Sequence, residues 1–271
     1  MAMKRNEKEF NREALNKLGI PLDEFILPSG YTCIIREHNG EDDELITTEK
    51  HLLDGTSIHR YVASIIQLHG YYGNGVTLKQ VKEMPIRDIY TILIKSRIFS
   101  IGEIIEFSYT FSDDEDEQLF REDLRRYIHN YESDFPKEGE EGYDKYKLEP
   151  YIDDPYENDI IIKLTSGKEV KMNYAQGQAE THMALLDSEK RNINQELKAR
   201  NIQFKSPDFS DWKTVISFSV FSKKDMQQIR TALRKVDPPL AIITDLEDPK
   251  NGNIHEVNVA GLQDFFFPRD L

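Results

Sequence analysis

The sequence feature that most constrains the fold is an internal repeat at a fixed shift of 137 residues. The segment LPSGYTCIIREHNG (27–40) aligns without a gap on LTSGKEVKMNYAQG (164–177), and 167 − 30 = 137 gives the shift. The pairs identical at this shift include Leu27 and Leu164, Ser29 and Ser166, Gly30 and Gly167, Gly40 and Gly177, Asp88 and Asp225, Ile92 and Ile229, Arg97 and Arg234, and Ile105 and Ile242. Self-similarity at a fixed period indicates a structural unit that the chain builds more than once.

The predicted secondary structure repeats in the same order, and this agreement counts for more than the low identity. In each half, a hairpin signal precedes two helical patterns and a further β-rich segment. The predicted strands are 24–27, 31–36, 103–111, 160–164 and 168–174, with a hairpin at Asn251-Gly252, a loop at 71–75, and helices at 56–69, from Ile86 behind Pro85, at 178–200 and at 223–236. We therefore predict an α+β fold of two related halves, each a β-hairpin followed by helices and a further strand or hairpin, from internal duplication.

Changes of composition divide the chain into four predicted parts. An amphipathic pattern at 4–18 marks one part outside the repeats, and an acidic stretch at 112–159 marks the other. The acidic stretch is weakly periodic except around 117–128, where a short helix is predicted. The parts are an N-terminal helical arm (1–22), a first repeat (23–111), an acidic helix and connector (112–158), and a second repeat with an aromatic C-terminal tail (159–271). The connector is predicted to be solvated, with an acidic docking strip as the alternative.

Four consecutive acids follow the first hairpin, and His38 lies just before them. They are Glu41, Asp42, Asp43 and Glu44, and the second copy has Gln178, Ala179, Glu180 and Thr181 at the same positions. Acids in the first turn of a helix meet the positive end of its dipole, which is worth about 0.3–1 kcal/mol each. We predict that these acids begin a helix and offer a partner a surface that only the first copy has. The alternative is a metal-dependent hydrolase that uses the acids with His38.

No other residue pattern predicts an enzyme. Cys33 lies in mid-strand without a cation-rich helix start, which favours a buried, inert thiol. The histidines lack a paired spacing such as H-E-x-x-H, the YYGNG loop lacks the Lys-Ser/Thr of a phosphate loop, and there is no nucleophile elbow. We therefore predict a protein without catalytic residues, metal ligands or cofactors.

Three consecutive phenylalanines, Phe265, Phe266 and Phe267, lie near the C-terminus. They cannot all face inward from one regular element, and an exposed trio would favour aggregation. Either they fill the core of the chain's own second half or they insert into a groove of a partner. We keep them, with Glu41 to Glu44, as candidates for partner binding.

Charge and cysteine content restrict the class of partner. The net charge of −14 disfavours nucleic acid and anionic membranes, because both require clustered Lys and Arg. Cys33 is the one cysteine, and the sequence has no signal-peptide pattern and no apolar run of membrane length. These features predict synthesis in a reducing cytoplasm and association with other proteins.

Several motifs together resemble the baseplate hub and hub assembly proteins of T-even-type contractile phages. They are LPSGYTCIIREHNGEDDELI (27–46), IRDIYTILIKSRIFSIGEIIEFSYTF (86–111), LTSGKEV (164–170) and QDFFFP (263–268). Many members of that family have paired cysteines at two places, in segments that resemble small zinc ribbons. At these places this chain reads TFSDDEDE and TDLEDPKNGN, without cysteine. The resemblance therefore does not imply a zinc site here. It implies a virion structural protein of the central tail baseplate.

The resemblance also implies partners among the other tail and baseplate proteins. Several copies in a ring are expected, and three copies of a two-repeat chain would present six similar faces between a threefold spike and a sixfold tube. A second interpretation is a tail assembly chaperone that is absent from the mature virion.

Overall fold

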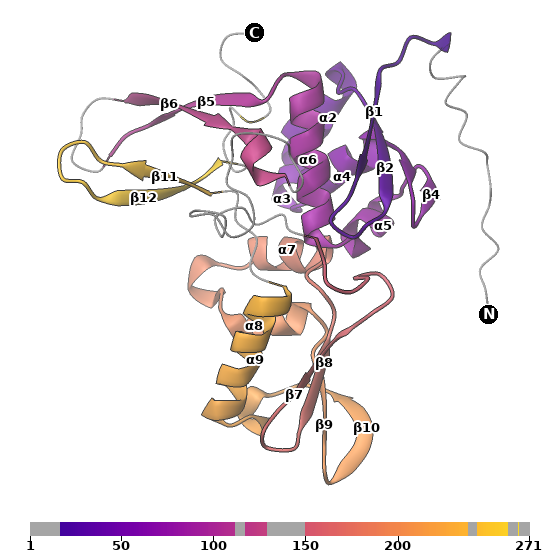
Figure 1. Cartoon of the computed structure of the whole chain (residues 1–271), viewed down its shortest axis with the longest axis vertical. Helices are drawn as coiled ribbons and strands as arrows, with labels where there is room; N and C mark the ends of the chain where they lie inside the picture. The colour runs from indigo at the N-terminus through magenta and orange to yellow at the C-terminus, as the bar shows by residue number, and fades with distance from the viewer. Residues whose placement is uncertain (1–16, 112–116, 129–149, 238–242, 260–264, 266–271) are drawn as a thin grey trace. The chain divides into compact units, whose positions relative to one another are not determined.

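The computed structural model describes residues 17–111, 117–128, 150–237, 243–259 and 265 (Figure 1). The chain divides into two compact units that interleave along the sequence. Unit 1 comprises residues 1–89 and 150–239, and unit 2 comprises residues 90–149 and 240–271. The boundary therefore falls inside one long helix, after Ile89, and each unit contains pieces of both predicted halves.

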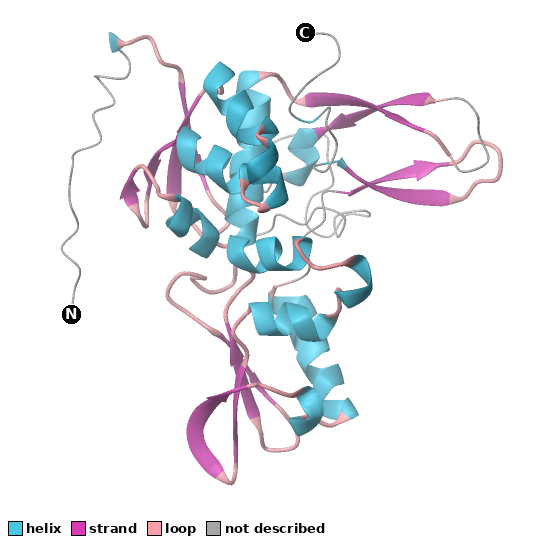
Figure 2. Cartoon of the chain, turned by 180° about the vertical axis from the view of Figure 1, so that it is seen from behind, coloured by secondary structure: helices cyan, strands magenta, loops and turns pink. Residues whose placement is uncertain are grey.

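The first half of unit 1 is an antiparallel sheet of order β1-β2-β3-β4 with short helices between its strands. Its strands are β1 (Leu22–Ile26), β2 (Thr32–Arg36), β3 (Ile66–His69) and β4 (Gly73–Asn74). Its helices are α2 (Gly40–Thr47), α3 (Glu49–Leu53), α4 (Ser57–Ile65), α5 (Leu78–Glu83) and the start of α6 (Ile86–Ser100). Figure 2 shows these helices gathered on one side of the sheet.

The second half of unit 1 builds a similar four-stranded sheet of order β10-β9-β8-β7. Its strands are β7 (Ile160–Lys163), β8 (Glu169–Met172), β9 (Gln203–Ser206) and β10 (Phe209–Thr214). Its helices are α7 (Gly177–Ala184), α8 (Ile193–Ala199) and α9 (Lys223–Val236), with short 3₁₀ turns at Ser188–Lys190 and Phe218–Val220. Alternate residues of β7 and β8 are buried against Leu197 of α8 and Ile229 and Leu233 of α9, as period-two strands require.

The two halves match at the predicted shift. Ile26 pairs with Thr32 across the first hairpin, and Lys163 pairs with Glu169 across the second, so both partners move by 137. The turn glycines Gly30 and Gly167 have φ angles of 85° and 83°, a region that only glycine adopts readily. Helices α2 and α7 also begin and end 137 residues apart. The two similar sheets are consistent with repeated halves, and the predicted α+β class is confirmed.

Unit 2 contains two antiparallel hairpins that also correspond at this shift. They are β5 (Ile104–Tyr109) with β6 (Gln118–Asp123), followed by a 3₁₀ turn at Leu124–Tyr127, and β11 (Ile243–Glu247) with β12 (Ile254–Asn258). Phe107 pairs with Phe120, and Thr244 pairs with Val257. Phe107, Phe111, Leu246 and Val257 form one apolar cluster, and Ile94 of α6, Ile105, Leu124, Tyr127, Val259 and Phe265 form another.

Four predicted elements require correction. The helix predicted at 56–69 ends at Ile65, and residues 66–69 form β3 because their backbone pairs with β2. The predicted loop at 71–75 contains the short strand β4. The predicted helix at 178–200 is two helices, α7 and α8. The acidic segment predicted as a helix at 117–128 forms β6 and a 3₁₀ turn, because β6 pairs with β5.

Other sequence predictions agree with the structure or fall outside it. Helix α9 has the predicted bounds and the predicted capping box between Ser222 and Asp225. The hairpin at Asn251-Gly252 is present between β11 and β12. Most of the helix predicted at 4–18, most of the connector, Phe266 and Phe267 lie outside the described residues. The predicted four-part division of the chain stays a prediction.

Candidate functional site

The acid run begins helix α2, as the sequence predicts. Asn39 is the N-cap: its side-chain oxygen accepts a hydrogen bond from the backbone N–H of Glu41 at 3.0 Å, and its own N–H donates to Asp42 Oδ2 at 2.9 Å. This reciprocal pair is a capping box, which satisfies backbone groups that a helix start leaves unpaired. Gln176, the equivalent of Asn39, makes no side-chain cap at the start of α7.

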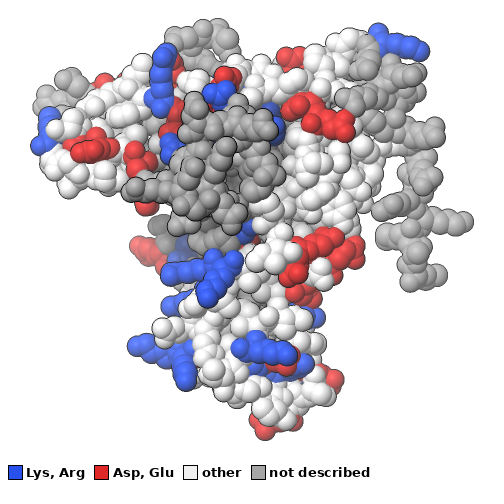
Figure 3. All heavy atoms as spheres, in the orientation of Figure 1, with Lys and Arg blue, Asp and Glu red and all other residues white. Residues whose placement is uncertain are grey.

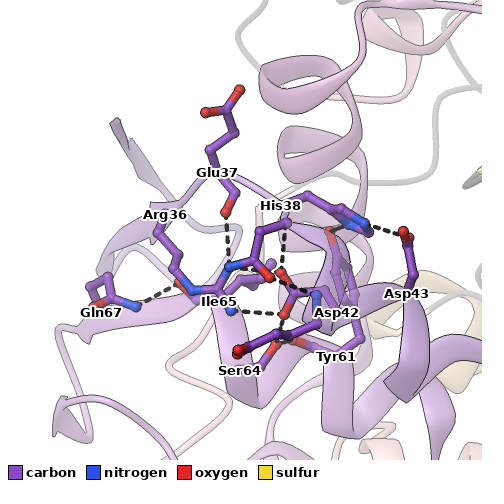
Figure 4. A network of polar contacts seen from close by, with 11 residues as sticks. Arg36, Glu37, His38, Asp42, Asp43, Tyr61, Ser64, Ile65 and Gln67 are labelled. Carbon is purple, nitrogen blue, oxygen red and sulfur yellow. Dashed lines mark hydrogen bonds and ion pairs between the residues drawn. The ribbon is translucent and has the colours of Figure 1, made fainter. Parts of the chain in front are cut away.

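Asp42 is the one buried member of the acid run, with a side chain 1% exposed. Arg36 donates to both of its carboxylate oxygens at 2.7 Å, and Ser64 Oγ donates at 2.7 Å (Figure 4). Burial by itself raises the pKa of Asp42, but the hydrogen bonds from Arg36, Ser64 and Asn39 outweigh it and leave the pKa below its usual value. Asp42 therefore joins β2, α2 and α4, and its carboxylate does not face solvent.

His38 links the same elements at the other side of the acid run (Figure 4). Its Nε2 lies 2.8 Å from Asp43 Oδ1, and its Nδ1 lies 3.2 Å from the hydroxyl of Tyr61 on α4. His38 is largely buried, while the Asp43 side chain is 46% exposed. Glu41 and Glu44 are exposed on α2. Within the described residues, no group of three or more His, Cys, Asp or Glu side chains could hold a metal ion.

The predicted aromatic site is only partly within the described residues. Phe265 is 1% exposed and lies in the apolar cluster of unit 2. Its carbonyl accepts a hydrogen bond from Arg97 Nε at 2.7 Å, and Arg97 also donates to the carbonyls of Gly102 and Ile104 at 2.5 and 3.2 Å. Phe265 is therefore a core residue of unit 2, and its ring does not face solvent.

A buried carboxylate that the sequence analysis did not single out lies at the first hairpin. Asp88 of α6 accepts hydrogen bonds from Ser29 N at 3.1 Å, Ser29 Oγ at 2.6 Å and the Tyr156 hydroxyl at 2.9 Å. Tyr156 also lies 3.1 Å from His69 Nε2. Burial raises the pKa of Asp88 to about 6 and lowers the pKa of His69 to about 4. The identical pair Asp88 and Asp225 was the sequence signal for this position.

A second buried ionic network joins the two halves of unit 1. Asp237 accepts hydrogen bonds from Arg200 at 2.5 Å and from Arg87 at 3.4 Å, and the backbone N–H of Ala175 donates to it at 2.7 Å. Arg87 also lies over the ring of Tyr151, 4.5 Å from its centroid. All three charged side chains are at most 3% exposed, so the network holds the halves together and offers nothing to a substrate.

Among the described residues of unit 1, α8 and α9 line an open groove. It contains two cavities of about 290 and 690 Å³, and Arg230 lines both. The apolar lining residues are Ile193, Phe218, Phe221, Met226 and Leu233. Lys223 and Arg234 add positive charge to the lining. Such a mixture of apolar and cationic groups suits a partner segment that has apolar and acidic side chains.

Unit 1 also contains the thiol of Cys33. Cys33 is a free, fully buried cysteine in β2, and burial raises the pKa of its thiol. A protonated, enclosed thiol is a poor nucleophile. Among the described helices, none is long and apolar enough to cross a membrane.

Comparison with known proteins identifies a family for this chain. No curated protein and no solved structure matches the chain. The family described as T4 bacteriophage base plate protein matches residues 24–267, a range that includes both hairpins of unit 2 and both four-stranded sheets except the first two residues of β1. The match covers most of the sequence, and the chain therefore belongs to the T4 bacteriophage base plate protein family.

Proposed function

We propose that this chain is a structural component of the central baseplate, or hub, of a contractile phage tail and acts through protein–protein contacts. Membership of the base plate family over residues 24–267 carries the proposal. The site chemistry agrees with it, because Asp42, the buried acid of the run that suggested a catalytic group, caps helix α2 and is held by Arg36. The partners are other tail and baseplate proteins, and the chain is made in the host cytoplasm before it enters the virion.

Several copies are proposed to form a ring, and three is the proposed number. A chain with two repeated halves places two similar folds in each subunit, so three copies present six related faces. The common register of the two hairpins and of β5–β6 and β11–β12 supports an internal duplication. This arrangement would join a threefold central spike to a sixfold tail tube.

The test is the location of the chain in purified particles of the phage that encodes it. Quantitative mass spectrometry is expected to find the chain at a fixed number of copies per particle, and a cryo-EM reconstruction is expected to place it at the centre of the baseplate in three copies. A chain at the baseplate rim, or in one or six copies, would contradict the hub or ring proposal respectively. Absence from finished particles would favour the second candidate, an assembly chaperone that leaves before the virion is complete.

A further inference from the structure

The two repeated halves of the chain carry opposite net charges over equivalent ranges. Residues 160–236 contain 14 Lys and Arg against 8 Asp and Glu, a net charge of +6, while the equivalent residues 23–99 contain 8 against 11, a net charge of −3. Figure 3 shows Lys and Arg side chains gathered over α8 and α9. The second half is therefore positively charged, although the net charge of the whole chain is −14.

The positive charge is concentrated at the groove between α8 and α9. Lys223, Arg230 and Arg234 line the groove and are exposed, and Lys235 is exposed one residue further along α9. No ion pair between described residues involves any of these four cations. Glu196 and Asp237, the acids in the lining, both pair with Arg200. The groove therefore presents uncompensated positive charge around apolar walls.

Three of the four cations are specific to the second half, and the fourth, Arg234, corresponds to Arg97, which is buried. The positions on α6 equivalent to Lys223, Arg230 and Lys235 are Ile86, Leu93 and Ile98. Along α6, Ile86 and Leu93 are buried, whereas α9 exposes its charged face. The shared fold explains the helix in both halves, but it does not require a cationic face on α9.

The first half presents the complementary surface on α2 and α3, which pack against each other. Glu41, Glu44 and Glu49 are exposed there, and Leu52 and Leu53 are 56% and 72% exposed. An exposed pair of large apolar side chains bordered by acids is typical of an interaction surface. The second half lacks this surface, because Glu41 and Glu44 correspond to Gln178 and Thr181, and the two leucines correspond to Glu189 and Lys190.

We infer that the α2–α3 surface of one copy of this chain docks in the α8–α9 groove of the next copy. The two surfaces complement each other in two ways, because acids on α2 and α3 would meet cations of the groove and the two leucines would meet its apolar residues. In Figure 1, α2 and α9 lie at opposite ends of unit 1, so one copy does not satisfy its own groove. Such a head-to-tail contact is heterologous, and it produces a closed ring when the rotation between copies closes. This interface deepens the proposed ring and rests on that proposal.

The test uses two charge-reversed forms of the full chain. The first has Arg230→Glu and Arg234→Glu in the groove, and the second has Glu41→Lys and Glu44→Lys on α2. We expect the wild type to self-associate in low salt, with an association that weakens as salt rises, and each variant alone to associate at least about tenfold more weakly. A 1:1 mixture should associate again, because the second variant keeps an intact groove and the first keeps an intact α2. Sedimentation velocity measures all three.

A control matched to the groove variant carries Lys79→Glu and Lys213→Glu, which change the net charge as that variant does but on exposed positions of α5 and β10 outside both surfaces. It should associate like the wild type, and far-UV circular dichroism should show that every variant is folded. If a variant fails to fold, Leu52→Ser with Leu53→Ser tests the same contact without charge reversal and should also weaken association.

A wild type that stays monomeric at low salt, or variants that associate as strongly as the control, would overturn the interface. The two proposals also separate experimentally. A monomeric chain present in purified baseplates would end the inferred interface and leave the baseplate function intact. A self-associating chain that is absent from finished particles would end the proposed baseplate function and leave the inferred interface intact.

Discussion

Asp88 and Asp225 occupy the same position in the two halves, yet their surroundings shift their pKa values in opposite directions. Each accepts a hydrogen bond from the serine of its hairpin turn, Ser29 or Ser166. Burial dominates at Asp88 and raises its pKa to about 6. At Asp225, burial by itself also raises the pKa, but hydrogen bonds from Ser166 and Ser222 and the charge of Lys168 outweigh it and lower the pKa.

The difference comes from two substitutions between the halves. Lys168 stands where the first half has Tyr31, and Ser222 stands where it has Pro85. The lysine places its ammonium 3.4 Å from Asp225, and the serine forms a capping box with it. Asp88 instead receives a hydrogen bond from Tyr156, which comes from outside the repeat. The shared backbone therefore produces the same hydrogen bond between turn and helix in both halves. The side chains around the carboxylate determine the direction in which its pKa shifts.

The largest expected effect comes from the position where the halves meet. Asp237→Ala removes the carboxylate that accepts from Arg87 and Arg200, so two buried cations lose their counter-charge. We expect the free energy of unfolding to fall by about 3–5 kcal/mol, measured by urea denaturation. The equivalent residue in the first half is Ser100, and Ser100→Ala should cost about 1 kcal/mol or less. Equal losses at the two positions would show that the network does not hold the halves together.

The pH dependence of stability tests the two aspartates directly. Because the folded-state pKa of Asp88 is about 6, above its ordinary 3.8, its contribution to stability is complete below pH 3.8 and is lost as the pH rises through 6. Replacement by Asn removes this titration. Relative to Asp88→Asn, the wild type should lose about 2 kcal/mol between pH 4 and 7, measured by urea denaturation at each pH.

Asp225→Asn is the matched control for that experiment. Its pKa is lowered, so its contribution is present above pH 3.8 and is lost only as the pH falls through the lower folded-state value. The slope between pH 4 and 7 should therefore match that of the wild type. A variant of Asp88 that keeps the wild-type slope would mean that another group produces it.

The smallest expected effect concerns the glycine that begins the helix after each hairpin. A Cβ at Gly177 would lie 2.5 Å from His59 Nε2 and 2.8 Å from Ile89 Cδ1, whereas a Cβ at Gly40 would meet nothing within 4 Å. Gly177→Ala should therefore cost about 1–3 kcal/mol through overpacking. Gly40→Ala should change stability by less than about 1 kcal/mol. Thermal unfolding of the pair compares them, and similar melting temperatures would contradict the close approach at Gly177.

Local sequence patterns identified the elements whose signals are contained in a few residues. Three such elements are the Pro28-Ser29-Gly30 turn, the Ser222–Asp225 capping box and the acids at the start of α2. Each can be recognised because its residues interact with backbone groups only a few positions away. The segments that were misread are those where distant pairing competes with local pattern. Residues 66–69 continue the apolar spacing of α4, but they form a strand because their backbone pairs with that of β2.

The candidate site shows the same limit. The sequence shows four equivalent acids beside His38, but it does not show that Arg36 and Ser64 enclose Asp42 while Glu41 and Glu44 stay exposed. Phe265 likewise belongs to a triplet in the sequence and to a core cluster in the structure. Whether a side chain is buried depends on which elements pack together, and a short stretch of sequence does not reveal that packing.

By itself, the sequence determined the shift of 137 residues, the α+β class, the hairpins at Gly30, Gly167 and Asn251-Gly252, and the starts of α2 and α9, because period, turn residues and caps act over a few neighbouring positions. The tertiary structure alone decided the strand identity of β3 and β6, the interleaved units, and the buried partners of Asp42, Asp88 and Asp237. The physical reason is that a backbone hydrogen bond or a buried charge is satisfied by whichever group lies nearest in space, wherever it stands in the chain.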